Sequence, residues 1–416
     1  MKARMSARRQ PLRSSEEITT MLLPLPVQRK TGCGRGCGLK DRAWEEPHLP
    51  APDIYEQELV SLDRAHVGDD VLQSLSSYNT IQGIIYREKR RNQPPLPQTA
   101  ADLQLSGHYS ETVNGRRFLL FSEENNGQCT LCFSTEEHLL LLAESHEVFV
   151  NGTFFTCPHI FGQILTISVD KDGKHLIVAF FLMPGRSRDI YERAFQRLLQ
   201  EMQDQDLALS LDLTRSDFEQ ALIGALQAVF MSARHRGCHF HYGQAVWRNV
   251  QACGLAATYT QNENLRVFVR KTVSLAFVRM AWGLLKATAP QVLGMGAFVA
   301  YFQNTWMDGQ YPPPIWNQHG NRGARTNNAT ESWHRKLKRV VGKPHPNIYT
   351  CLEALRCIES AQCVGLLQAA NGATQRQRKK KWQKKGAAIP RLEEKLQAGE
   401  IMMDAFLRKG QRHCGL

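Results

Sequence analysis

The stretch HEVFVNGTFF, residues 146–155, opens the part of the chain that decides its fold. A second apolar run, IFGQILTISV, follows at 160–169, and a third, HLIVAFFL, at 175–182. All three runs are rich in β-branched and aromatic residues, which favour strands. Asp172 and Gly173, between the second and third runs, form a tight turn of the kind that joins antiparallel strands. The sequence therefore predicts three consecutive strands, of which the last two form a hairpin.

The residues after the third run alternate between helical and strand patterns. Residues 188–202 place apolar side chains at helical spacing, residues 207–213 return to a strand pattern, and residues 218–230 predict a second helix. This order opens the ribonuclease H-like fold, an α/β fold in which helices cover both faces of a mixed sheet. Because many α/β domains begin in this way, the order by itself implies no function.

Composition and residue spacing divide the chain into five parts with different predicted structures. In order, the predicted parts are a disordered basic arm (1–50), a small helical lead-in and Pro-rich linker (53–97), a short β/α segment (98–145), the core (146–352) with a mainly helical insertion at about 245–320, and C-terminal helices with a basic tail (353–416). Within the β/α segment, 118–121 and 130–133 predict short strands around a turn at 125–127.

The net charge of +13 and the pI near 9.3 favour a polyanionic partner, with nucleic acid as the first candidate. Charge alone equally fits a soluble protein with a basic tail. No apolar run approaches the roughly 20 residues that span a bilayer, so we expect a soluble intracellular protein without a membrane segment.

The eleven cysteines are scattered and do not form a secreted disulfide scaffold. Cys33 with Cys37 and Cys129 with Cys132 are the two close pairs. Neither pair is followed by further ligands at zinc-finger spacing, so we expect free thiols and no zinc.

Four segments together carry a family resemblance. They are VFVNGTFFTCPHIFGQ (148–163), LTRSDFEQALIGALQAVF (213–230), GCHFHYGQAVWR (237–248) and RTNNATESWHRKLKR (325–339). In order and spacing they resemble the Mutator-like element (MULE) DNA transposases, over about residues 146–352. The resemblance implies a ribonuclease H-like core with a helical insertion between its second and third catalytic carboxylates.

The resemblance also implies a catalytic site. Enzymes of this fold use three carboxylates to hold two Mg²⁺ ions, and the family places the second at Asp217 and the third at Glu331. Cys238 and His241 occupy the family's Cys-x-x-His positions, which we interpret as a structural element. The first carboxylate is replaced by Asn151. An amide is neutral and carries an NH₂ donor that repels cations, so two-metal catalysis is expected to be impaired.

Nearby acids offer no obvious replacement for the missing carboxylate. Asp170 and Asp172 lie on the antiparallel second strand and its turn, so we expect them at the opposite end of the sheet. Asp212 is near Asp217 in sequence, but strand alternation leaves its direction open.

Each site residue also has an ordinary structural interpretation. Asp217 alone would be a helix N-cap, and Glu331 an exposed helix residue whose helix Asn327 and Asn328 help to start. Cys238 with His241 would be a buried thiol near a histidine. A zinc ion there would need further ligands, for which the candidates are His235, His239 and His334.

Two basic segments are candidates for DNA contact. The helix of Glu331 carries Arg335, Lys336, Lys338 and Arg339 beside Trp333. The run RQRKKKWQKK (376–385) contains Arg378, Lys379, Lys380 and Lys381. The run predicts nuclear targeting, DNA contact or both, and the alternative is a solvated helix end. An aromatic loop with Trp306, Tyr311, Trp316 and His319 either stacks on unpaired bases or, as we expect, packs over the core.

The sequence therefore predicts a nuclear, double-stranded-DNA-binding protein derived from a MULE cut-and-paste transposase and impaired at Asn151. Its ancestral partners are transposon ends, and holding two ends together suggests a homodimer by analogy. The alternatives are an active Mg²⁺-dependent transposase that tolerates Asn151 and a genomic relic without selected activity.

Overall fold

The computed structural model describes residues 37–46, 49–65, 73, 75–91, 93–279, 281–372 and 380–413. These residues form two compact units, a small one that ends at Lys89 and a large one that runs from Arg90 onwards and also includes Pro50. None of the helices described in these ranges combines the length and apolarity that crossing a bilayer requires.

The small unit consists of helices α2 (Cys37–Glu45), α3 (Ala51–Arg64) and α5 (Tyr78–Arg91). The helices α3 and α5 were predicted from their apolar spacing. The prediction of a disordered arm over 1–50 is wrong for α2, because this helix buries Ala43 and its Arg42 bonds to Glu58 of α3 at 3.3 Å. Residues 1–36 of that arm, with Cys33, lie outside the described residues.

The large unit is built on a seven-stranded mixed sheet in the order β1-β2-β5-β4-β3-β6-β7. The strands are β1 (Leu119–Asn125), β2 (Gln128–Phe133), β3 (Glu147–Thr153), β4 (Gln163–Lys171), β5 (Lys174–Met183), β6 (Leu213–Ser216) and β7 (Arg234–Gly237). The strands β3, β4 and β5 are antiparallel, as predicted, whereas β6 and β7 run parallel to β3. Asp172 and Gly173 both have positive φ angles in the β4–β5 turn.

Two strand predictions need comment. The β1–β2 hairpin forms as predicted, with Asn126 and Gly127 at positive φ, and it extends the core sheet because β2 pairs with β5. The strand predicted at 207–213 is wrong, because β6 begins only at Leu213, opposite the first residue of β3. Residues before Leu213 have no strand beside them; Leu211 is instead buried in the core without strand pairing.

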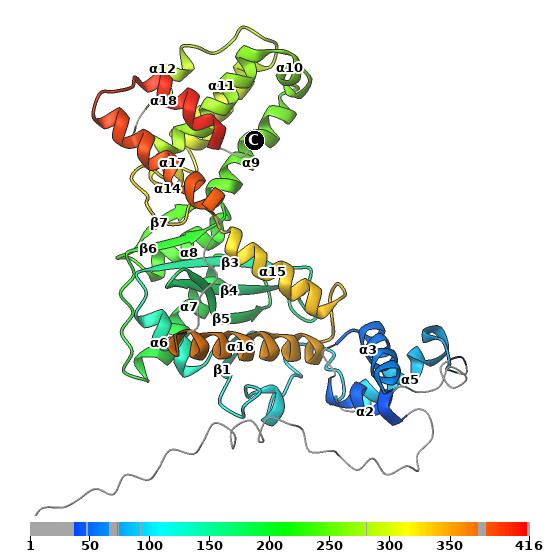
Figure 1. Ribbon diagram of the computed structural model, residues 1–416. Helices are drawn as coiled ribbons and strands as arrows, with labels where there is room; N and C mark the ends of the chain where they lie inside the picture. Colours follow the sequence, from blue (N-terminus) through cyan, green and yellow to red (C-terminus); the bar gives the residue numbers. More distant parts are fainter. Residues whose placement is uncertain are drawn as a thin grey trace, which may run out of the picture. The chain divides into compact units, whose positions relative to one another are not determined.

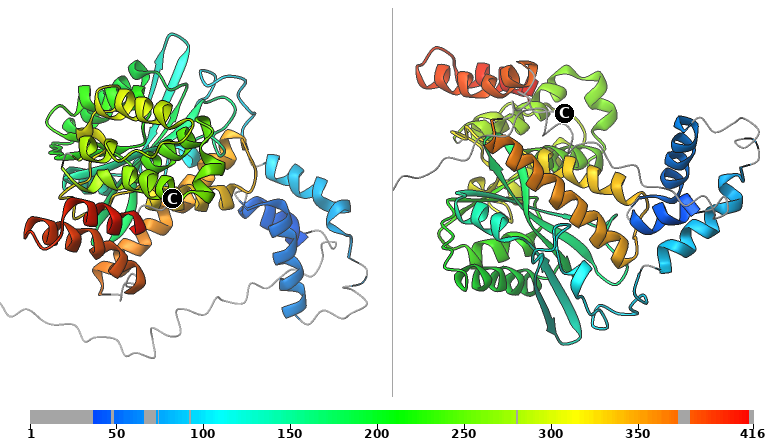
Figure 2. Two further views of the ribbon diagram at one scale, coloured as in Figure 1. Left: turned by 90° about the horizontal axis from the view of Figure 1, so that it is seen from above. Right: turned by 60° about the horizontal axis from the view of Figure 1, so that its bottom comes forward.

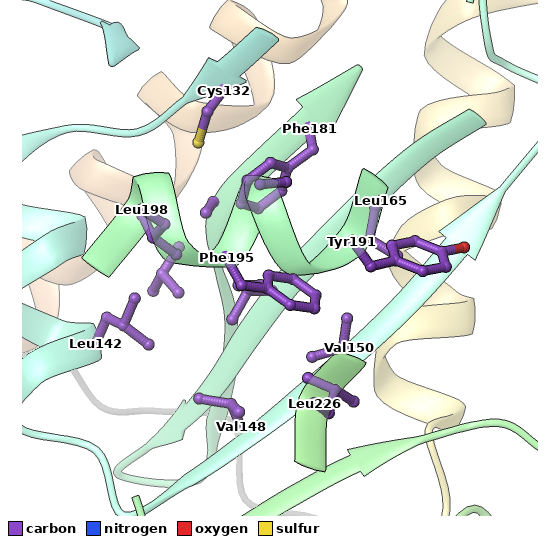
Figure 3. Close-up of a cluster of buried hydrophobic side chains, with 14 of the residues drawn as sticks. Cys132, Leu142, Val148, Val150, Leu165, Phe181, Tyr191, Phe195, Leu198 and Leu226 are labelled. Atoms are coloured by element: carbon purple, nitrogen blue, oxygen red, sulfur yellow. The ribbon is translucent and has the colours of Figure 1, made fainter. Parts of the chain in front are cut away.

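Helices cover both faces of the sheet, as the ribonuclease H-like fold requires. One face carries α6 (Glu136–Ala143), α7 (Arg188–Gln203) and α8 (Gln220–Val229), and Figure 3 shows Tyr191, Phe195 and Leu198 of α7 lying over Val148 and Val150 of β3. The opposite face carries α15 (Asn328–Val341) and α16 (Ile348–Ala370), which lie side by side in the right-hand view of Figure 2. Because side chains alternate along a strand, Asn151 belongs to the face of α15.

A second apolar core lies in the helices beyond β7 (Figure 1). Six of its helices follow β7 directly in the sequence: α9 (His239–Ala252), α10 (Ala256–Gln261), α11 (Glu263–Ser274), α12 (Trp282–Lys286), α13 (Met295–Phe302) and α14 (Pro313–Trp316). The C-terminal helices α17 (Lys380–Gln397) and α18 (Met403–Gly410) complete it through Ile389, Phe406 and Leu407. Short 3₁₀ helices lie at Gly107–Tyr109, Leu275–Phe277 and Gln411–His413, and a short π-helix lies at Gln303–Met307.

Candidate active site

Three neighbouring parallel strands end at the same edge of the sheet, and the candidate site lies at that edge. On β3 and β6, Phe149 is opposite Arg215, and continuing this register by two residues puts Asp217 beside Asn151. On β6 and β7, Ser216 is opposite Gly237, so the next step puts Cys238 beside Asp217. The topology thus brings together residues from sequence segments that lie far apart.

The register of β3 and β6 is fixed below the site by a buried arginine. Arg215 is 1% exposed, forms an ion pair with Glu147 of β3, and donates from Nη1 to Gln318 Oε1 at 3.1 Å. Its guanidinium also lies 6.0 Å from the centre of the Phe149 ring. Because a buried cation is costly unless it is paired, these contacts strongly favour the observed pairing of the two strands.

The helix α15 brings Glu331 to the site across the β3 face. The preceding residue, Thr330, is fully buried, with Oγ1 at 3.3 Å from Ser168 Oγ and 2.8 Å from His175 Nε2. These bonds fix the first turn of α15 on β4 and β5. Glu331 then lies with Oε1 at 3.6 Å from His241 Nε2.

Cys238 joins the start of α15 to the start of α9. It is fully buried at the N-cap position of α9, and its sulfur accepts a hydrogen bond from the Asn327 backbone N–H at 3.3 Å. The neighbouring His239 N–H donates to the Arg325 carbonyl at 2.9 Å. The expected role of Asn327 as a side-chain cap is wrong, because its amide makes no cap hydrogen bond. The helix is held by Cys238 instead.

His241 interacts with both carboxylates of the site. Burial opposes its charged form, but a hydrogen bond with Cys238 and the negative charges of Asp217 and Glu331 raise the pKa of His241 above its ordinary value. The imidazolium is therefore the favoured partner of this carboxylate pair.

Asn151, Asp217, Cys238 and His241 all lie within one segment that matches a known protein family. Residues 148–245 match the sequence model of the MULE transposase domain. The chain contains a MULE transposase domain. The matched segment runs from β3 into α9, and Glu331 lies outside it. Comparison with curated proteins gives no match.

A two-Mg²⁺ centre, which the MULE family implies in general, does not fit the donors at this edge. Mg²⁺ prefers charged oxygen ligands in octahedral geometry. The side chain of β3 at this edge is the Asn151 amide, 6% exposed, which adds no charge. Asp217 and Glu331 supply two negative charges between them, and both already interact with His241. The charge of two divalent ions is thus left largely uncompensated.

The pocket beside Asp217 contains residues that the sequence analysis missed. A pocket of about 670 Å³ is lined by Asp217 and His241 with Arg186, Glu219, Gln244 and Arg248. Glu219 accepts a hydrogen bond from the Tyr191 hydroxyl at 3.0 Å, and burial, with the charge of Asp217, raises the pKa of Glu219. The sequence Asp-Phe-Glu could have indicated Glu219, because this acid follows Asp217 by two residues. Asp217 Oδ1 accepts from the Glu219 N–H at 3.3 Å.

Other candidates lie elsewhere. Asp170 bonds to His175 at 2.7 Å near the β4–β5 turn, and Asp212 lies by His146 at the start of β6, so both are at the opposite end of the sheet from Asn151. His235 faces Thr214 and Ser216. His239 is buried and His334 is partly buried, and the loss of hydration lowers the pKa of each. The described residues show no cluster of three metal-ligating side chains at the MULE-domain site.

The basic segments are only partly described. Arg335, Lys336, Lys338 and Arg339 are exposed on α15, one turn or more beyond Glu331. The expected aromatic partner on that face is wrong, because Trp333 is buried against Phe180. The aromatic loop packs as expected, with Trp306 1% and Trp316 3% exposed. Lys380 and Lys381 begin α17, whereas Arg378 and Lys379 lie outside the described residues.

Proposed function

We propose that the chain is a double-stranded-DNA-binding protein derived from a MULE-type cut-and-paste transposase, in which Asn151 disables strand cleavage. The observation that supports this proposal is the parallel pairing of β3 with β6, whose register, continued by two residues, puts Asp217 beside Asn151. We take Asn151 to stand where the family has its first carboxylate. Cleavage would need a charged metal ligand at that position, and an amide cannot become one. The supporting structure of the site is otherwise intact around Cys238 and Thr330.

DNA binding does not depend on the missing carboxylate. The exposed side chains of Arg335, Lys336 and Arg339 form a positive strip on α15 that continues from Glu331. Such a strip suits the phosphates of a duplex, since phosphate contacts need cations but no metal. The proposed localisation is the nucleus, on the strength of the Lys- and Arg-rich run at 376–385. By analogy, we propose a homodimer on paired DNA ends.

The second candidate function is an active Mg²⁺-dependent transposase. The retained Asp217 and Glu331, with the pocket next to them, favour it. A plasmid assay separates the two candidates. Supercoiled DNA is incubated with Mn²⁺ and the native chain, the Asn151→Asp variant, or Asn151→Asp combined with Glu331→Gln, and both nicking and binding are measured.

We expect all three proteins to bind DNA and only Asn151→Asp to nick it. Metal-dependent nicking by the native chain would establish the active transposase instead. If Asn151→Asp binds DNA but does not cut it, Asn151 is not what prevents cleavage, and that part of the proposal is wrong. If no variant binds duplex DNA, the DNA-binding assignment is wrong.

A further inference from the structure

A second cluster of ligating side chains lies where α6 meets the C-terminal half of α16. His138 comes from α6, and Glu359 and Cys363 come from successive turns of α16. One ligand atom from each residue lies within 4.8 Å of the other two. His138 is 0% and Glu359 1% exposed, whereas Cys363 is partly exposed.

The histidine in this cluster has no hydrogen-bond partner in the described part of the chain. Neither ring nitrogen of His138 hydrogen-bonds to any described residue. Leaving such groups buried and unsatisfied is destabilising, so a fully buried imidazole whose two nitrogens find no partner among the described residues calls for a ligand. Burial, with the nearby charge of Arg116, lowers the pKa of His138 to about 4. The ring is therefore neutral and has a lone pair for coordination.

The carboxylate beside it also lacks a cation. Glu359 Oε1 accepts a hydrogen bond from Cys363 Sγ at 2.9 Å, and Glu359 forms no ion pair with any described residue. Arg116 approaches the cluster, with Nη2 at 3.9 Å from Cys363 Sγ, but it pairs with the more exposed Glu137. A buried carboxylate without a cationic partner is destabilising, and a divalent ion would supply the missing charge.

We propose that His138, Glu359 and Cys363 bind one zinc ion, which links α6 to α16. Nitrogen, oxygen and sulfur donors together suit zinc, whereas Mg²⁺ and Ca²⁺ take oxygen donors almost exclusively. Three protein ligands leave the fourth tetrahedral position to water. Zinc bonds of about 2.0–2.3 Å place two ligands about 3.5 Å apart. The three side chains therefore need only small rotations to reach one ion.

Coordination changes one protonation state. Burial and the neighbouring Glu359 carboxylate raise the pKa of Cys363 to about 11, so the metal-free thiol is protonated and donates to Glu359. Zinc displaces this proton, which leaves to solvent, and the thiolate takes its place as a ligand. The two charges of the ion are then balanced by thiolate and carboxylate, and Arg116 remains balanced by Glu137.

The test uses the full chain, stripped with a chelator and titrated with Zn²⁺ in a calorimeter. Thermal unfolding is followed with and without the metal, and Co²⁺ serves as a spectroscopic probe of thiolate coordination. The variants are Cys363→Ser and His138→Gln. The matched control is Cys357→Ser, on the same helix, because burial raises the pKa of Cys357 to about 11 as well but this thiol lies outside the cluster. A second control, Glu331→Gln, removes a possible ligand at the MULE-domain site.

We expect one Zn²⁺ per native chain, a rise in melting temperature on binding, and a thiolate-to-Co²⁺ charge-transfer band. Cys363→Ser and His138→Gln should each weaken Zn²⁺ binding at least about tenfold and abolish the thermal shift. Both controls should bind like the native chain. Glu359→Gln guards against a folding artefact, because it removes a buried charge and should fold without metal yet lose the zinc-induced shift. Native-like zinc binding in Cys363→Ser, or none in the native chain, would overturn the proposal.

Discussion

At the residue scale, the site depends on a buried ion pair between two residues that the sequence did not nominate for the site. Arg215 and Glu147 lie on neighbouring parallel strands, and their pairing fixes the register that sets Asp217 beside Asn151. Arg215 is almost fully buried and Glu147 is partly buried. Removal of the carboxylate leaves the guanidinium charge uncompensated, whereas a surface ion pair has no such effect.

We therefore expect Glu147→Gln to lower the free energy of unfolding by about 3 kcal/mol. The matched control is Glu144→Gln, which removes an exposed partner of Lys171 and should cost less than about 1 kcal/mol. Urea unfolding of both variants measures the difference. Equal small effects would show that the buried pair does not fix the strands.

The raised pKa of His241 predicts a pH-dependent contribution to stability. Its unfolded value is near 6.5, and Cys238, Asp217 and Glu331 raise the pKa in the folded chain against the opposing effect of burial. The contribution is thus fully present below about pH 6.5 and is lost as pH rises through the folded pKa. The difference in free energy of unfolding between the native chain and His241→Gln should be larger at about pH 5.5 than at about pH 9.

NMR titration of the His241 ring gives an independent check. Its pKa should fall in Asp217→Asn and in Glu331→Gln, because each variant removes one of the charges that stabilise the imidazolium. An unchanged pKa in both variants would contradict the assigned geometry. A neutral-to-neutral control, Gln244→Ala, should leave the pKa of His241 close to its native value.

How far the sequence predicts the site depends on how local the information is. Asp217, Cys238 and His241 fall in short segments, so the resemblance of those segments to the MULE pattern was enough to nominate them. Glu331 is about a hundred residues further along, and its contact with His241 needs the completed fold. In the His138 cluster only Glu359 and Cys363 are close in sequence, and the third member lies on the distant helix α6, so ligand spacing alone does not predict the cluster.

At the element scale, α15 has two functional faces. Its buried face carries Thr330, Trp333 and Leu337 onto the sheet, and its exposed face carries the basic strip. The sequence predicted this helix and its charges but put Trp333 on the wrong face, because it did not weigh burial against aromatic exposure. In the same way, the first residue of β6 is set by where its partner strand β3 begins and not by the apolar run before it.

The basic strip predicts a specific salt dependence. Replacing Lys336 and Arg339 with Gln should weaken duplex binding and reduce the slope of log K against log salt by about 2, since each lost phosphate contact contributes about 0.9. Fluorescence anisotropy with a short duplex at several salt concentrations measures the slope. Arg193→Gln is the control, because α7 lies on the opposite face of the sheet. An unchanged slope in the double variant would place DNA elsewhere.

At the scale of the whole molecule, the apolar cores of the large unit contain residues from segments that lie far apart in the sequence. The helices α17 and α18 close the core of the insertion, in which Phe406 is fully buried beside residues of α11. The sequence predicted C-terminal helices but gave no indication of where they pack, because amphipathic helices carry no record of their partners. The C-terminal segment thus belongs structurally with the insertion.

The shared core predicts that a C-terminal substitution destabilises the insertion. We expect Phe406→Ala to cost about 3–5 kcal/mol by leaving a cavity. Met402→Ala, at a 78% exposed position nearby, should cost little. Limited proteolysis with mass spectrometry locates the effect, and cleavage should increase within residues 239–316. Increased cleavage confined to α18 itself would contradict the proposed packing.

The central claim is that Asn151 removes the metal centre, and calorimetry of Mg²⁺ binding in the presence of a short DNA duplex tests it most directly. The native chain, Asn151→Asp, and Asn151→Asp combined with Glu331→Ala are compared. Our account predicts that only Asn151→Asp binds two ions and that the added Glu331→Ala change abolishes this gain. Binding of two Mg²⁺ ions by the native chain would contradict it.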